Sequence, residues 1–81
     1  MDKIESLLDI KYEGLYLERR LISGPPENYA EIDKAFEDLV DRFYQENDQL
    51  ITGRQHETAR GNLDYFIILV EQTLAHYKEE Q

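Results

Sequence analysis

The chain has 81 residues, contains no cysteine and carries a formal net charge of −9 at pH 7. This length allows one small domain, residues 1–81, without a second core, and the absence of cysteine excludes disulfides and thiolate metal sites. Because 41% of the residues are hydrophobic, the composition is too apolar for a disordered acidic chain, and we expect a folded domain.

The charge also narrows the classes of partner. An isoelectric point near 4.5 opposes direct binding to nucleic acid or to an anionic membrane surface, because both need clustered Lys and Arg. The longest apolar run, residues 65–70, is too short to span a bilayer, and no signal peptide is recognisable. We therefore expect a soluble, cytoplasmic protein that binds neither nucleic acid nor membrane directly.

The first predicted helix covers residues 2–22. Asp2 and Glu5 have the spacing of a capping box, which indicates a helix start. A Gly-Pro-Pro sequence that begins at Gly24 ends the helix, because glycine suits a helix C-terminus and proline cannot continue one.

The second predicted helix covers residues 27–52 and begins between Pro26 and Asn28. Apolar residues at helical spacing extend to position 51, and Gly53 is the expected break. The polar segment 46–49 indicates an alternative, in which a loop ends this helix early.

The third predicted helix covers residues 55–79, with one face of apolar residues from Ala59 to Tyr77. Alternation typical of strands does not persist beyond a few residues. The sequence therefore predicts an all-α fold, an antiparallel three-helix bundle with short loops.

The first and third predicted helices carry more apolar residues than one core face uses. On the first helix, positions 4, 8, 12, 15 and 22 form one stripe, and a second stripe runs at coiled-coil spacings of 3 and 4 residues. On the third helix, a similar second stripe lies beside the face that is expected to pack in the core. Either each helix contacts two neighbours in the bundle, or the second stripes form an interface.

We predict an interface, which gives a homodimer or an obligate complex with another protein and would also support a small core. The predicted interface residues are Leu7, Ile10, Gly14, Leu17 and Leu21 of the first helix and Gly61, Tyr65, Ile68, Leu69 and Gln72 of the third. The two glycines in this set would allow helix backbones to approach closely.

Acidic residues gather on the second predicted helix, opposite its apolar stripe. The predicted acidic face consists of Glu27, Glu31, Glu37, Asp38, Asp41 and Asp48. Carboxylates one helical turn apart have a spacing comparable to that of nucleic-acid phosphates, so they suit a basic groove. Lys34 and Arg42 interrupt this row and are expected to pair with Asp38, so a solvated face is the competing interpretation.

Residues that could carry chemistry are sparse. His56 and His76 lie 20 positions apart without a further ligand at a zinc-binding spacing, and His76 is expected to pair with Glu80. The serines lack a neighbouring base, and the four glycines are isolated rather than gathered in a phosphate-binding loop. The sequence therefore predicts a protein that is not an enzyme and that has neither metal nor cofactor.

Two functions remain as expectations. The first is a small, acidic, non-enzymatic protein-interaction module of regulatory or adaptor type, which binds a protein partner, basic or otherwise, through apolar helix faces. The alternative is an acidic antagonist, such as a DNA mimic, antitoxin, immunity protein or phage anti-defence protein, that blocks a basic nucleic-acid-binding protein. Only the binding of an acidic antagonist to its partner should weaken steeply as the salt concentration rises.

Overall fold

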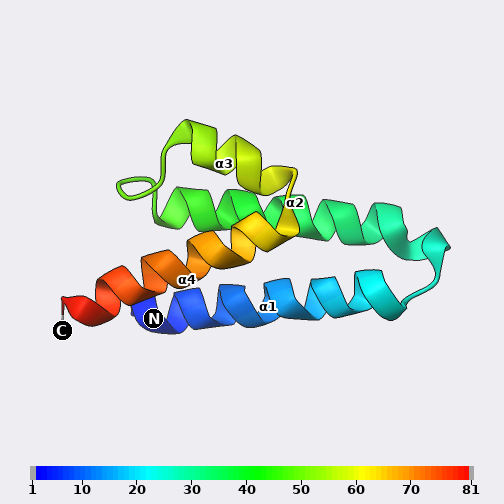
Figure 1. Ribbon diagram of the computed structural model, residues 1–81, viewed down its shortest axis with the longest axis horizontal. Helices are drawn as coiled ribbons and strands as arrows, with labels where there is room; N and C mark the ends of the chain where they lie inside the picture. Colours follow the sequence, from blue (N-terminus) through cyan, green and yellow to red (C-terminus); the bar gives the residue numbers. More distant parts are fainter. Residues whose placement is uncertain (1, 81) are drawn as a thin grey trace.

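The computed structural model describes residues 2–80, which form helices joined by short connections (Figure 1). Within these residues there are four α-helices and one turn of 3-10 helix. They are α1 (Lys3–Ser23), η1 (Pro26–Asn28), α2 (Tyr29–Glu46), α3 (Gly53–Arg60) and α4 (Leu63–Glu79). The all-α prediction is confirmed, whereas the prediction of three helices is wrong, because the third predicted helix is divided into two.

The helix α1 begins and ends within one residue of the predicted bounds, 2–22. The Asp2 side chain accepts a hydrogen bond from the Glu5 backbone N–H at 2.9 Å, as its capping role requires. At the other end, the Gly24 N–H donates to the Arg20 carbonyl oxygen at 2.7 Å. A Cβ at Gly24 would lie 2.5 Å from that oxygen, so only glycine fits without a backbone shift.

The second predicted helix, 27–52, is shorter in the structure, and its first residues belong to η1. It ends before Asn47, whose side-chain amide donates a hydrogen bond to the Phe43 carbonyl oxygen at 2.9 Å. The predicted end at residue 52 is therefore wrong, and the alternative of an early loop is confirmed for residues 47–49, since Glu46 is still helical. Ile51 is nevertheless buried, so it reaches the core from a loop rather than from a helix.

The third predicted helix, 55–79, is interrupted at Gly61 and Asn62. The Asn62 backbone is extended, and its side chain accepts a hydrogen bond from the Tyr65 N–H at 3.0 Å, which starts a new helix. Asparagine favours this capping position and glycine has a low helix propensity, so the pair is a natural break. The interruption lets α3 and α4 point in different directions (Figure 1).

The helices α1 and α2 lie antiparallel, and α4 runs back along α1 toward the end of the molecule where both termini lie (Figure 1). The short helix α3 packs on α2 and α4, on the side away from α1. Reciprocal hydrogen bonds between Thr52 and Gln55 form a capping box at its start. The molecule measures 43 × 23 × 19 Å.

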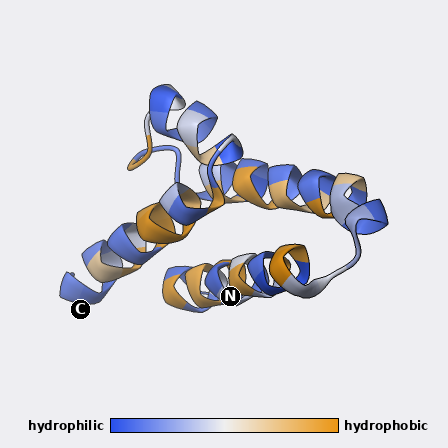
Figure 2. Ribbon diagram, turned by 45° about the vertical axis from the view of Figure 1, so that its right-hand side comes forward, coloured by the Kyte–Doolittle hydropathy of each residue, from blue (hydrophilic) through white to orange (hydrophobic). Residues whose placement is uncertain are grey.

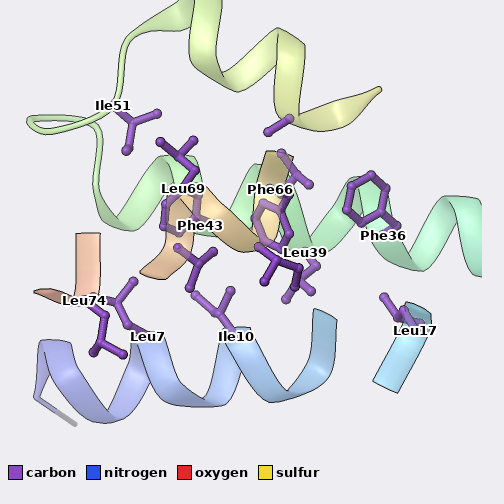
Figure 3. Packing of buried hydrophobic residues seen from close by; sticks show 14 of the residues in the cluster. Leu7, Ile10, Leu17, Phe36, Leu39, Phe43, Ile51, Phe66, Leu69 and Leu74 are labelled. Atoms are coloured by element: carbon purple, nitrogen blue, oxygen red, sulfur yellow. The ribbon is translucent and has the colours of Figure 1, made fainter. Parts of the chain in front are cut away.

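The core is centred on Phe66, which is completely buried. Its ring lies between those of Phe36 and Phe43, edge to face, with centroids 5.5 Å away in both pairs (Figure 3). Gly14 of α1 faces α4, and a Cβ there would lie 2.9 Å from Cδ1 of Ile67. The missing side chain therefore lets α1 and α4 approach closely around the aromatic cluster.

Candidate functional site

Only one of the two apolar stripes of α1 is buried in the core. Leu7, Ile10, Gly14 and Leu17, which the sequence assigned to an interface, are buried in the core of the single chain, and Leu21 is half-buried. These side chains are therefore not available to a partner while the fold is intact.

The other stripe of α1 faces outward, and sequence reasoning did not select it as an interface. Tyr12 is 62% exposed, Leu15 38% and Ile22 79%, and Leu8 is half-buried. One signal in the sequence distinguishes the stripes. The inward stripe contains the glycine that permits close helix packing, whereas the outward stripe contains a tyrosine, whose hydroxyl favours water or a polar partner.

The predicted interface residues near α4 are divided between the core and the surface. Leu69 is buried, and Tyr65 is half-buried. Ile68 is 53% exposed, and Gln72 is also exposed. Gly61 is exposed at the bend before α4. Of the apolar side chains predicted in this helix, only Ile68 is largely open to a partner.

One ion pair shows how α1 and α4 are aligned. The Lys11 ammonium lies 3.9 Å from a carboxylate oxygen of Glu71. Because the two helices are antiparallel, one turn farther along α1 and one turn back along α4 lead to Leu15 and Ile68. These two exposed side chains therefore lie at the same level on neighbouring helices.

We call this surface the outer face and define it by five residues. They are Leu8, Tyr12, Leu15 and Ile22 of α1 and Ile68 of α4. The middle of α4 is a broad hydrophobic band, and hydrophobic segments recur along α1 (Figure 2). The outer face thus combines apolar residues from two packed helices.

The surface around Ile22 is hollowed on two sides. One depression lies between the end of α1 and the start of α4 and is lined by Leu21, Ile22, Gly61 and Leu63, among others. A second lies along α1 beside Leu15 and Ile22. Depressions next to an exposed isoleucine offer a partner both a protruding apolar group and space for its own side chains.

The acidic face of α2 is partly covered by α3. Arg60 contacts Glu37 at 3.0 Å and Asp41 at 3.3 Å. The His56 ring lies 2.8 Å from Asp41 and stacks on the Tyr44 ring, with centroids 4.3 Å apart. Two of the six predicted acidic positions are therefore already paired with a neighbouring helix of the same chain.

The other predicted acidic positions are exposed to solvent. Glu27, Glu31, Asp38 and Asp48 lie on the surface, and Asp38 pairs with Lys34 at 3.9 Å, as predicted. Eight acidic and two basic residues between positions 27 and 48 give a charge of −6. Residues 3–23 contain four acidic and four basic residues and are neutral. Most of the net charge therefore belongs to the α2 region, while the outer face lies mainly on a neutral helix.

Arg42 joins α1 to α2 instead of pairing with Asp38 as predicted. Its guanidinium lies 2.9 Å from Glu46, 3.7 Å from Asp9 and 4.0 Å from Glu13. The buried Ser6 hydroxyl donates a hydrogen bond of 2.5 Å to the Glu46 carboxylate. That hydrogen bond, together with the Arg42 guanidinium, lowers the pKa of Glu46 below its ordinary value.

Acid is expected to weaken the contact that Glu46 makes with Ser6 of α1. Because the pKa of Glu46 is lower in the folded chain than in the unfolded chain, its contribution to stability is present at neutral pH and is lost as pH falls through the folded-state pKa. The free energy of unfolding by urea, measured from pH 7 to pH 3, should therefore differ between wild type and Glu46→Gln at neutral pH and converge in acid. Glu31→Gln, at an exposed position of α2, is the control, and its free energy of unfolding should follow that of wild type across the pH range. If the free energy of unfolding depends on pH equally in Glu46→Gln and in wild type, the role assigned to Glu46 is wrong.

Neither histidine belongs to a metal-holding cluster in the part of the chain that the structure describes. Within residues 2–80, there is no group of three His, Asp or Glu side chains arranged to hold a metal ion. His76 pairs with Glu80 at 3.1 Å on the surface, as predicted. No helix in this range is both long and apolar enough to cross a membrane.

Comparison of the chain with protein-family models, with curated proteins and with solved structures finds no match. The outer face is therefore characterised by its own geometry, exposure and charge.

Proposed function

We propose that this chain is a small, non-enzymatic protein-interaction module of regulatory or adaptor type, located in the cytoplasm, and that it binds a protein partner through the outer face. The observation that carries the proposal is the exposure of Tyr12, Ile22 and Ile68, each of which is more than half accessible. Scattered apolar residues are normal on protein surfaces, but neighbouring ones on two packed helices favour an interaction site.

The composition of the outer face supports the same proposal. Tyr12 is a rigid aromatic group, a type enriched among the residues that dominate binding energy. The Lys11–Glu71 pair and the exposed Arg19 supply charged groups around the apolar residues. An apolar centre with a charged rim is the usual anatomy of a protein interface.

The acidic antagonist remains the second candidate and has less support. A basic partner directed at Glu37 and Asp41 would have to displace Arg60 and His56 of α3. Otherwise it would rely on the exposed positions, of which Asp38 already contacts Lys34. Binding of this kind would weaken steeply with salt, because it depends on exposed charges.

Affinity capture with matched variants distinguishes the two candidates. The tagged chain, Ile68→Glu and Glu31→Lys would be used to capture proteins from an extract of the native host that also contains the untagged chain. We expect a protein, either another one or the untagged chain, that is retained by wild type and by Glu31→Lys and is lost with Ile68→Glu. Circular dichroism verifies that each variant is folded.

The opposite result would contradict the proposal. If the captured protein remains on Ile68→Glu but is lost with Glu31→Lys and with added salt, the acidic face binds the partner and the antagonist function is favoured.

A further inference from the structure

Resting on the proposed function, we infer that the partner at the outer face is a second copy of this chain. The two copies are related by a twofold axis that runs parallel to the antiparallel pair α1 and α4. In this arrangement α1 of each copy packs on α4 of the other. The four helices then enclose Tyr12, Leu15 and Ile68 of both copies, which the single chain leaves exposed.

The distribution of charge determines which face a second copy can approach. Each chain has a net charge of −9, of which −6 lies between residues 27 and 48. Two copies that met through their α2 regions would bring these charges together. Residues 3–23 are neutral, so approach through the outer face involves less repulsion than approach through the α2 region. A strongly basic partner would instead be drawn to the other side of the molecule.

Charge complementarity also selects the direction of the axis. An axis parallel to the helices keeps every residue at its own level, so Leu15 lies opposite Ile68 of the second copy and Lys11 lies opposite Glu71. A twofold axis perpendicular to the helices would instead pack α4 of one copy against α4 of the other. Asp64 of each copy would then lie near Glu71 of the other, and the two carboxylates would repel each other. The parallel axis is therefore favoured, because it pairs opposite charges.

Arg19 and Asp64 give this arrangement a specific contact. Both are exposed, and within residues 2–80 neither has an ion-pair partner within 4.0 Å. Glu18 and Ile22, which stand one residue before and three residues after Arg19, line the same depression as Asp64. Arg19 is therefore at the level of Asp64, and the parallel axis brings Arg19 of one copy toward Asp64 of the other.

Sedimentation equilibrium over a range of protein concentrations measures the association. We expect wild type to reach the mass of a dimer, and Ile68→Glu to remain a monomer with unchanged helix content. Each of the single changes Arg19→Asp and Asp64→Arg should raise the dimer dissociation constant about five- to tenfold, because attraction at the rim becomes repulsion. The double variant Arg19→Asp/Asp64→Arg should return it close to the wild-type value.

Glu31→Arg is the matched control, since it changes the net charge by the same amount as Asp64→Arg at a position of α2 away from the outer face. It should not weaken the dimer. Failure of the double variant to recover association would overturn the proposed axis. A wild-type chain that stays monomeric up to about 1 mM would overturn the inference as a whole. The proposed function would survive that result if a different captured protein is lost with Ile68→Glu, and it would fail with the inference if none is.

Discussion

Leu17→Glu is expected to unfold the chain, whereas Leu15→Glu, two residues earlier on the same helix, is expected to leave it folded. Leu17 is 3% exposed and faces the core, while Leu15 is 38% exposed on the outer face. An uncompensated carboxylate in an apolar core costs at least about 3–5 kcal/mol. That cost is comparable to the total stability of a small domain, about 5–15 kcal/mol.

Far-UV circular dichroism and urea unfolding of the two variants measure this difference. Both changes put the same side chain on α1, so helix propensity and net charge are matched. At protein concentrations low enough for the chain to be monomeric, the expected result is loss of the cooperative transition for Leu17→Glu and a transition near that of wild type for Leu15→Glu. The reverse order would show that α1 presents the other stripe to the core.

Phe66→Ala is expected to lower the free energy of unfolding by about 3–5 kcal/mol, which is typical of a fully buried phenylalanine. The Phe66 ring is completely buried and contacts the rings of Phe36 and Phe43, so its removal leaves a cavity where α1, α2 and α4 meet. The loss combines apolar transfer, cavity formation and two edge-to-face contacts.

Ile68→Ala is the control for this prediction. Ile68 lies two residues farther along the same helix and is 53% exposed, so in the monomer, at protein concentrations too low for association, its truncation should change the free energy of unfolding by about 0.5 kcal/mol or less. Chemical denaturation of both variants gives the comparison. Similar losses at the two positions would contradict the assignment of Phe66 to the centre of the core.

Local signals were sufficient to predict α1 and its limits. The Asp2 cap and the glycine and prolines after Ser23 act on neighbouring backbone, so their effects can be read without knowledge of the fold. The apolar stripe of α2 was equally clear, because Ile32, Phe36 and Phe43 recur on a single face opposite charged residues. All three of these side chains are buried.

The division of the third predicted helix was missed because apolar spacing continued across it. Gly61 fits the spacing of a residue for close packing, but glycine followed by asparagine also favours a turn. The Asn62 cap is short-range chemistry and could have been recognised. Its consequence is long-range, since the break brings α3 beside α2 and places Arg60 against Glu37 and Asp41.

The choice between the two stripes of α1 could not be made from periodicity. Both stripes have helical spacing and similar apolarity. The pattern therefore shows that α1 has two apolar faces, but not which of them packs in the core. The choice depends on the contact of Gly14 with α4, where a Cβ would lie 2.9 Å from the Ile67 side chain. A contact between residues 53 positions apart is determined by packing of the whole chain rather than by local sequence.

Chemical-shift mapping by NMR tests the central claim, that the outer face is the interaction surface, most directly. Spectra of the isotope-labelled chain would be recorded as its binding partner is added, either the unlabelled chain or the captured protein. The outer face predicts the largest changes at Leu15, Ile22 and Ile68. Changes centred instead on Glu27, Glu31 and the rest of the acidic face would contradict it.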